Sequence, residues 1–292
     1  MIVDAHHHVW RRADLPWLLG PTVPRIFGDY GPLKRDYPMA EFLDDVAGTG
    51  VARSVHVQAN WAPNWAFDEA AWVCRVHAET GWPHAISAFC DMRQADARRD
   101  LDRLARLPLV RGIRHQMHHH ENPLYSFAPA DDTVAEEAVQ RNVARLADYG
   151  FLFELQIFAH QADAALRLVD ACPGVIFVLQ HAAMPEDPSE PGMRRWRQAL
   201  EALASRRSVH AKLSGIGTFL RRNDPPLISR VLDETVSAFG ADRCLFGSNF
   251  PIEKMWTSYG ALLSAWRDAA AGLPDEDRDA IFSQTASRLY RL

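Results

Sequence analysis

The sequence predicts a (β/α)8 barrel, in which eight parallel strands form a closed inner ring and helices surround it. Extended apolar runs alternate with amphipathic segments along the 292 residues, and there are eight such runs. Alternation of strand and helix is typical of a parallel sheet, and eight units close a barrel. The alternative is a doubly wound open sheet, which needs a glycine-rich phosphate loop after its first strand, and no such loop is present.

The predicted strands are short apolar runs with polar residues near their ends. Continuous apolar runs of this kind are typical of parallel strands that are buried on both faces. They lie at Ile2–Asp4, Ser54–Gln58, Ala85–Phe89, Val110–Arg114, Phe151–Ile157, Val175–His181, Val209–Ser214 and Cys244–Phe250. Because no linker, internal repeat or low-complexity tract interrupts the series, we expect one barrel domain over residues 1–292.

Amphipathic segments fill most intervals between the strands. Their apolar residues recur at the spacing that places them on one face of a helix. The predicted helices lie at Phe67–Thr80, Asp100–Arg106, Thr133–Tyr149, Gln161–Ala171, Met193–Ser205, Leu227–Phe239, Ser258–Ala271 and Asp275–Tyr290.

Two long intervals show neither helical nor alternating periodicity. They run from Trp10 to about Ala40 and from Gln116 to Asp132. Each follows a strand and therefore lies at the C-terminal end of the barrel, where enzymes of this fold carry their chemistry. Loops of this length are usually lids or binding loops, and we expect these two to cover a site.

Composition favours an enzyme with a large core and excludes several classes of partner. Hydrophobic residues make up 48% of the chain, and the net charge of −5 argues against nucleic acid and anionic membranes as partners. No apolar stretch is long enough to span a bilayer, and the first residues do not form a signal peptide. We expect a cytoplasmic protein that acts on a small molecule; a homodimer is left open. The cysteines lack a CxxC pair and are expected to be reduced, and they are Cys74, Cys90, Cys172 and Cys244.

A histidine motif follows the first strand-like residues directly. Residues two apart on a strand point to the same face, so Asp4, His6 and His8 are expected to project together. Such a group suits either a metal site or a metal-free site for proton transfer at the end of a strand.

Polar residues also stand near the ends of most other strands. Because the strand ends of a barrel converge, we expect these side chains to line one pocket, since polar groups are rare in a purely structural core. Each residue alone also has a structural explanation, such as an ion pair for Arg114 or a hydrogen-bonded core position for His181. The residues are Gln58, Arg114, His115, Glu154, Gln156, His181, Lys212, Ser214 and Asn249.

These motifs resemble the amidohydrolase superfamily, and within it the lactonase branch. The resemblance covers nearly the whole chain. Within the lactonase branch, the sequence is similar to L-fuconolactonases and to a pyrone-dicarboxylate lactonase. It implies a carboxylic ester hydrolase that opens a small polar lactone, either a sugar lactone or a carboxylated one. Its main motifs are Val3-Asp4-Ala5-His6-His7-His8-Val9-Trp10, Val110-Arg111-Gly112-Ile113-Arg114-His115, Val178-Leu179-Gln180-His181, Lys212-Leu213-Ser214-Gly215 and Phe246-Gly247-Ser248-Asn249-Phe250-Pro251.

Two departures from the superfamily pattern concern the metal. Members that bind metal tightly add a histidine on the fifth strand and an aspartate at the end of the eighth, where this chain has Gln156 and Asn249. An amide cannot act as a general base and is a poor zinc ligand. We therefore expect a metal-free site and assign no cofactor, with zinc or another divalent ion at His6 and His8 as the alternative.

The resemblance, adjusted for these departures, implies a role for each strand-end residue. His181 is the expected general base, because a neutral imidazole titrates near working pH. The expected catalytic residues are His6, His8, His181 and Asn249. The expected substrate-binding residues are Gln58, Arg114, His115, Gln156, Lys212 and Ser214.

Two other functions stay open at this point. One is a metal-dependent decarboxylase or other carbon–carbon lyase of the same superfamily, which would need a bound divalent ion. The other is a non-catalytic barrel that binds a ligand tightly without turnover.

Overall fold

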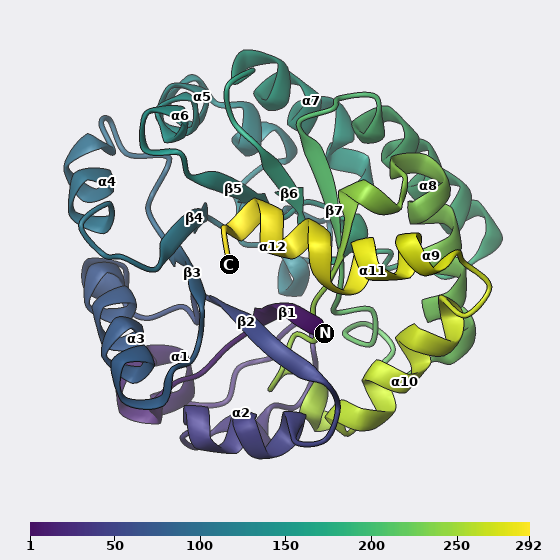
Figure 1. The fold of residues 1–292 in the computed structure, drawn as a ribbon. Coiled ribbons are helices and arrows are strands. Elements are labelled where there is room, and N and C mark those ends of the chain that lie inside the picture. The colour runs from purple at the N-terminus through teal and green to yellow at the C-terminus, as the bar shows by residue number, and fades with distance from the viewer.

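The strands follow one another around the barrel in the order of the sequence. In the computed structural model, which describes residues 1–292, eight parallel strands run in the order β1-β2-β3-β4-β5-β6-β7-β8, and helices surround them (Figure 1). The predicted (β/α)8 barrel is therefore confirmed. The strands are β1 (Ile2–His7), β2 (Val51–Val57), β3 (Ala85–Phe89), β4 (Val110–Arg114), β5 (Leu152–Leu155), β6 (Phe177–Leu179), β7 (Val209–Leu213) and β8 (Cys244–Phe246).

The barrel closes between β1 and the residues that follow β8. The His8 backbone N–H donates to the Phe250 carbonyl at 2.7 Å, and the Asn249 N–H donates to the His6 carbonyl at 2.7 Å. A Cβ atom at Gly247 would lie 2.6 Å from the Cβ of His6, so only glycine allows this close approach. The closure places Asn249 beside two histidines from the opposite end of the chain.

The helices confirm most of the predicted segments and differ in four places. The segment predicted as one helix over Thr133–Tyr149 is divided into a 3-10 turn and two short helices, and the segment predicted over Asp275–Tyr290 is divided by a π-helical turn at Ala280–Gln284. Helices over Pro16–Leu19 and Met39–Val46 were not expected. No helix combines the length and the apolar surface of a membrane span. The helices are α1 (Pro16–Leu19), α2 (Met39–Val46), α3 (Ala66–Thr80), α4 (Arg98–Leu104), α5 (Glu137–Ala144), α6 (Leu146–Tyr149), α7 (Ala162–Ala171), α8 (Glu190–Ala204), α9 (Pro225–Phe239), α10 (Tyr259–Ala269), α11 (Asp275–Asp279) and α12 (Thr285–Tyr290).

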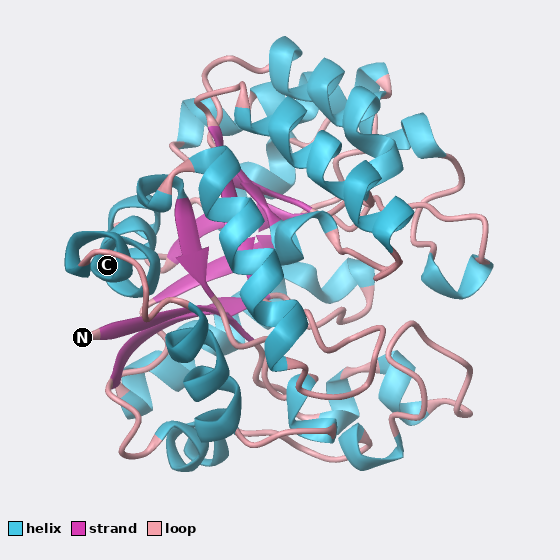
Figure 2. Cartoon of the chain, turned by 90° about the vertical axis from the view of Figure 1, so that its right-hand side faces the viewer, coloured by secondary structure: helices cyan, strands magenta, loops and turns pink.

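Helix α12 covers the N-terminal end of the barrel, which is the end that faces the viewer in Figure 1. Its Leu289 and Tyr290 pack against the inward residues Val3 and Ala5 of β1 in a small buried cluster. Figure 2 shows the long loops gathered on the side away from both termini. Because one end is closed by α12, a ligand can reach the barrel interior only from the C-terminal end.

Strand β1 departs from regular alternation. Val3 and Ala5 face the barrel interior, whereas Asp4 accepts hydrogen bonds from Ser248 and from the Tyr259 hydroxyl of α10. The pairing of β1 with β2 is irregular between Asp4 and His7. The prediction that Asp4 projects together with His6 and His8 is therefore wrong, because the irregularity turns the two histidines inward without it.

Candidate active site

A pocket opens at the C-terminal end of the barrel, with an empty volume of about 740 Å³ that includes its mouth. Both long intervals predicted as lids contribute residues to its wall. Those of the first interval lie between Trp10 and Phe27, and those of the second lie between Gln116 and Phe127. The structure brings together six of the predicted site residues here. They are His8, Gln58, Arg114, Gln156, His181 and Asn249.

Three other predicted site residues lie close to this wall without forming it. The His6 ring packs behind it, with ring centroids 5.1 Å from His8 and 4.8 Å from His181. The Ser214 hydroxyl oxygen lies 2.8 Å from Nδ1 of His181 and supports that ring. His115 turns aside, where its Nδ1 accepts from the backbone N–H of Met92.

Lys212, the remaining predicted site residue, is fully buried in the barrel and forms an ion pair with a carboxylate. Its Nζ donates to both oxygens of Glu154 at 2.8 and 2.7 Å, and neither side chain is exposed. Glu154 also accepts hydrogen bonds from Gln180 and from the Tyr290 hydroxyl. The ion pair therefore fills the barrel interior beneath the site and holds Lys212 away from the pocket.

Arg114 presents its guanidinium to the pocket from β4. Its Nε donates to Gln180 at 2.8 Å, one Nη donates to the Gln58 carbonyl at 3.3 Å, and the other donates to Gln156 at 2.6 Å. A guanidinium carries five N–H donors, so two of them remain for a ligand. Burial lowers the pKa of Arg114 to about 10, and the charges of Glu154 and Glu69 oppose this shift. The side chain therefore stays cationic at neutral pH.

His181 is held by an unusual backbone turn after β6. Four consecutive residues, His181 to Met184, adopt left-handed φ values of 53°, 47°, 60° and 48°. Residues with a side chain rarely adopt this conformation, and such strain tends to occur at functional sites. Trp196 fixes the turn by donating from Nε1 to the Ala182 carbonyl at 2.6 Å. A Cβ at Gly215 would lie 2.5 Å from Nδ1 of His181, so the glycine makes room for the ring.

Burial keeps the pocket histidines neutral. It lowers the pKa of His181 well below its ordinary value, and the charges of Arg114 and Lys212 add to the effect, so the expectation that this imidazole titrates near working pH is wrong. It also lowers the pKa of His8 to about 3, helped by Arg114. Nδ1 of His8 lies 2.6 Å from the Val57 carbonyl and must carry the proton, because a carbonyl only accepts. Nε2 of His8 is therefore a hydrogen-bond acceptor.

The histidines do not form a complete metal site. Both ring nitrogens of His6 are buried without a hydrogen-bond partner, which is a feature that a metal could satisfy. However, no group of three or more His, Cys, Asp or Glu side chains is arranged to hold a metal ion. A catalytic zinc needs three protein ligands. The residues present therefore do not fit such a site, and we route no step through a metal.

Asn249→Asp is expected to supply the missing ligand. The change places a carboxylate beside His6 and His8, and we expect the affinity for zinc to rise at least about tenfold, or ~1.4 kcal/mol, by titration calorimetry. Asn60→Asp is a matched control, because Asn60 lines the same pocket and also has a left-handed φ, of 63°. If the Asn249→Asp variant and the wild-type protein bind zinc with equal affinity, residue 249 does not face the histidines.

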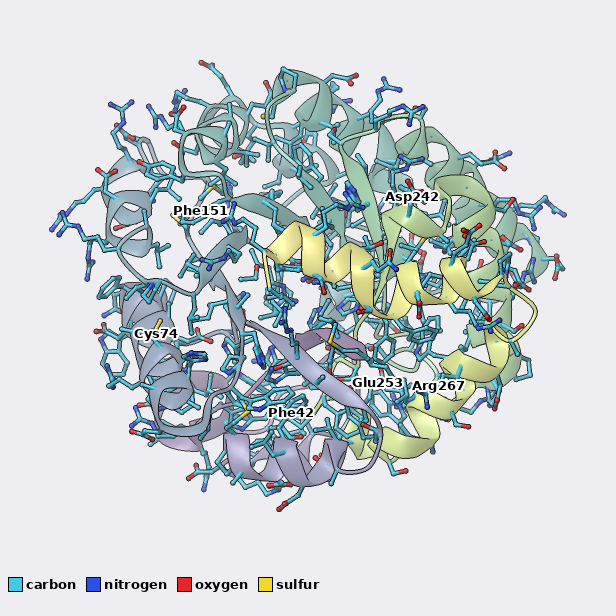
Figure 3. All side chains as sticks on the ribbon, in the orientation of Figure 1. Phe42, Cys74, Phe151, Asp242, Glu253 and Arg267 are labelled. Atoms are coloured by element: carbon cyan, nitrogen blue, oxygen red, sulfur yellow. The ribbon has the colours of Figure 1, made fainter.

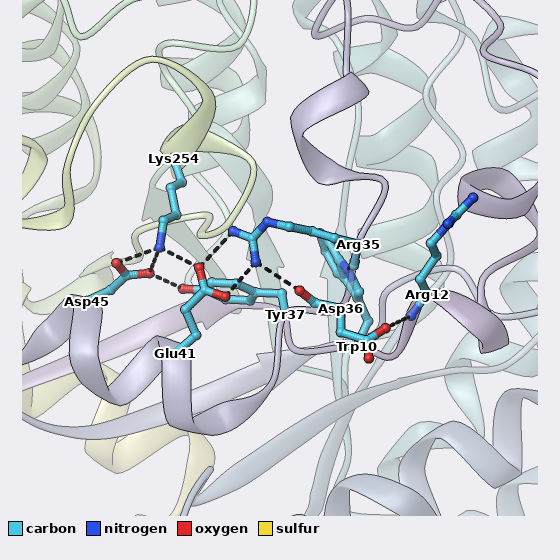
Figure 4. Close-up of polar contacts among 8 residues, drawn as sticks. All are labelled: Trp10, Arg12, Arg35, Asp36, Tyr37, Glu41, Asp45 and Lys254. Carbon is cyan, nitrogen blue, oxygen red and sulfur yellow. Dashed lines mark hydrogen bonds and ion pairs between the residues drawn. The ribbon is translucent and has the colours of Figure 1, made fainter.

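An ion-pair cluster ties the first long loop to the residues after β8 (Figure 4). Nζ of Lys254 donates to Glu41 and Asp45 at 2.7 Å each. Arg35 binds Glu41, and the backbone carbonyl of Arg35 accepts a hydrogen bond from Nε1 of Trp10 at 2.8 Å. The cluster thus fixes Trp10 in the pocket wall.

Two pocket residues, Arg25 and His118, do not stand at strand ends and were not expected there. The Arg25 guanidinium lies 5.1 Å from the Trp17 ring centroid and makes no ion pair, and its Nε has no hydrogen-bond partner. Nδ1 of His118 is also buried without a partner. The sequence signal for these two residues was their position in the two long loops. A loop without periodicity, however, does not show which of its side chains point inward.

A family model described as amidohydrolase matches residues 3–292 of the chain. The chain belongs to the amidohydrolase family. This amidohydrolase is 30% identical to the uncharacterised protein y4mH of Sinorhizobium fredii, a match that covers 100% of this chain and 98% of that protein. It is 28% identical to an L-fucono-1,5-lactonase of Burkholderia ambifaria, over 99% of this chain and 95% of that protein.

A solved amidohydrolase from Burkholderia multivorans, a structure with bound zinc, is also similar to this amidohydrolase. The TM-score is 0.83 at 27% identity, over 100% of this chain and 99% of that one. Together with the family match, this likeness confirms the predicted superfamily and shows that the chain is an amidohydrolase-type hydrolase.

Proposed function

We propose that this amidohydrolase opens the cyclic ester of a small anionic lactone in the pocket described above. The observation that carries the proposal is the chemistry of the wall, which contains Arg25 and Arg114 but no carboxylate. Several buried polar atoms of this wall lack partners, among them Nε2 of Gln58 and Nδ1 of His118. Buried polar groups are normally hydrogen-bonded, so an oxygen-rich ligand is the natural partner for them.

The residues of the wall can supply each step of lactone hydrolysis. Water attacks the ester carbonyl, and Nε2 of His181 accepts the proton that the water loses. The free N–H groups of Arg114 and the Asn249 amide stabilise the oxyanion that forms. When the ring C–O bond breaks, His181 returns the proton to the alkoxide, and a hydroxy acid results.

Aromatic side chains on the lid loops favour a flat or ring-shaped substrate. Trp10, Trp17, Phe27 and Phe127 all belong to the pocket wall. Nε1 of Trp17 donates to the Ala59 carbonyl at 3.0 Å, which fixes its ring over the pocket. Aromatic faces pack on the apolar surface of a ring, while the cations bind its charged substituent.

The test is hydrolysis of matched lactones, with and without a carboxylate, followed by proton release. We expect Arg114→Lys to lower kcat/KM for the carboxylated lactone about 10- to 100-fold and to affect the neutral lactone less, because lysine lacks the planar fork. The control is Arg206→Lys, an exposed residue paired with Asp170. An equal loss on both lactones would show that Arg114 does not bind the carboxylate.

Failure to hydrolyse any lactone would overturn the proposed function. Release of carbon dioxide that depends on a divalent ion would then favour the decarboxylase, and tight binding without turnover would favour the ligand-binding barrel.

A further inference from the structure

A second cavity adjoins the candidate active-site pocket at the C-terminal end of the barrel. Its empty volume is about 800 Å³, which includes open solvent at its mouth. We call this cavity the side cleft; its wall comes from the first long loop and from residues at the ends of β2, β3 and β4. The side cleft is a branch of the pocket, because the two share Trp17, Arg25, Gln58, Asn60, Gln116 and Phe127.

Two buried N–H donors in the wall of the side cleft have no hydrogen-bond partner. Oε1 of Gln58 accepts from the Asn60 backbone N–H at 2.7 Å, which leaves Nε2 of Gln58 as the unpartnered end of the amide. Nε1 of Trp61 is the other donor, and an indole N–H can only donate. Gln58 is 2% exposed and Trp61 is 8% exposed. Since buried polar groups are normally hydrogen-bonded, these donors indicate a ligand that accepts hydrogen bonds.

His115 adds a third donor. It was predicted to bind substrate, and it lines the side cleft rather than the pocket. Its Nδ1 accepts from the Met92 backbone N–H at 3.1 Å, so Nε2 carries the proton of the neutral ring. The Phe89 ring packs edge-on against this imidazole, with centroids 5.3 Å apart, and holds it in place.

An unpaired cation stands where the side cleft meets the pocket. The Arg25 guanidinium carbon lies 5.1 Å from the Trp17 ring centroid and 5.6 Å from that of Tyr30. Nε of Arg25 has no hydrogen-bond partner, and no aspartate or glutamate lines the side cleft. The wall therefore offers a positive charge and several N–H donors without a negative charge to balance them. A carboxylate, which only accepts hydrogen bonds, matches such a wall.

The aromatic part of this wall is fixed by contacts behind it. The Trp61 ring packs on Trp72 of α3, the helix marked by Cys74 in Figure 3, with centroids 5.9 Å apart. The Arg11 guanidinium carbon lies 5.8 Å from the first ring centroid and 5.2 Å from the second. A preformed wall loses little conformational freedom when a ligand binds, so the side cleft suits a specific occupant.

We propose that the side cleft is a second subsite of the candidate active site, which binds a carboxylate at the end of an arm attached to the lactone ring. The ring and the group bound by Arg114 occupy the pocket, and the arm passes Arg25 into the side cleft. This inference rests on the proposed function, since it places the lactone in the pocket. It narrows the substrate class to lactones with an acidic side arm.

The first test measures kcat/KM for γ-butyrolactones with a ring carboxylate and an arm of two, three or four carbons that ends in a carboxylate or in a carboxamide. For at least one arm length, we expect the wild-type enzyme to prefer the carboxylate arm about tenfold or more, because hydrogen bonds to a charged group are the stronger ones. Arg25→Gln and Trp61→Phe should each lower this preference about fivefold or more. The loss should appear chiefly in KM, since the arm binds alike in the ground and transition states.

Trp61→Phe keeps an aromatic ring and removes only the N–H donor, so its matched control is Trp65→Phe. Trp65 belongs to the same connection, is 48% exposed and lines neither cavity. Arg206→Gln, at an exposed residue, is the control for Arg25→Gln. Both controls should keep the preference. Equal kcat/KM for the two arm ends at every arm length, or a full preference in Trp61→Phe, would overturn the inference.

The second test does not depend on turnover. The indole N–H signal of Trp61, assigned by its loss in Trp61→Phe, is followed in nitrogen–proton NMR spectra during titration with the ring-opened hydroxy acid that carries the carboxylate arm. Butanoate is titrated separately. We expect the hydroxy acid to shift the signal at a concentration at least about tenfold lower than butanoate, because its other end is bound in the pocket.

The outcomes separate this inference from the proposed function. If no lactone is hydrolysed but the hydroxy acid shifts the Trp61 signal in this way, the proposed function fails and the side cleft stands as a carboxylate site. If lactones are hydrolysed but the signal does not move, the side cleft is not a subsite. A shift by butanoate at the same concentration would also overturn the inference, because a free acid would then be the occupant.

Discussion

Replacement of His181 by asparagine is expected to lower kcat for lactone hydrolysis by about 10²–10⁴-fold, the usual cost of removing a positioned acid or base. Asparagine can keep the hydrogen bond to Ser214 that His181 now makes at 2.8 Å, but it has no Nε2 to accept a proton. The fold should be preserved, because the change leaves the apolar residues of β6 untouched. Steady-state kinetics and the unfolding midpoint together separate the two effects.

His210→Asn is the matched control for this prediction. His210 is a buried histidine of β7 that does not line the pocket. Its replacement should change kcat little. A His181→Asn enzyme with kcat within about threefold of the unchanged enzyme would place the general base on another residue.

Lys212→Met is expected to destabilise the barrel by about 3–5 kcal/mol, because it leaves the carboxylate of Glu154 buried without its cation. Both side chains of this pair are fully buried, so no water can replace the lost partner. The double variant Lys212→Met with Glu154→Gln should recover much of the loss, since it removes the unpaired charge as well. Urea unfolding measures the free energy of unfolding of each variant.

The control for this prediction is the exposed ion pair between Arg206 and Asp170. Arg206→Met should leave the unfolding midpoint nearly unchanged, because water solvates the remaining carboxylate. If Lys212→Met were as stable as this control, the buried ion pair would contribute nothing to folding.

Hydrophobic patterning predicted the barrel well and the strand ends poorly. All eight strands lie where an apolar run predicted one, because strands buried on both faces leave a continuous signal. The apolar runs that predicted β6 and β8 were longer than the strands themselves, because the chain stays buried after it leaves the sheet. His181 and Asn249 therefore lie in left-handed turns beyond the strands, and hydropathy carries no information about φ.

The candidate site could be predicted where the barrel geometry alone places a residue. His8, Arg114 and Asn249 stand near strand ends and meet in the pocket. The alternation rule failed for Asp4 because it assumes a regular strand. Lys212 lies in the barrel interior, but its pairing with Glu154 depends on contacts across the barrel that strand positions do not reveal.

The left-handed turn at His181 also bears on how this protein can change over evolutionary time. Each of these φ values costs a residue with a Cβ about 1–2 kcal/mol that glycine would not lose. Glycine at Ala182 or Ala183 would relieve this strain, yet it would also give the loop more conformations and loosen the imidazole. Relief of backbone strain and rigidity of the imidazole therefore oppose each other at this turn.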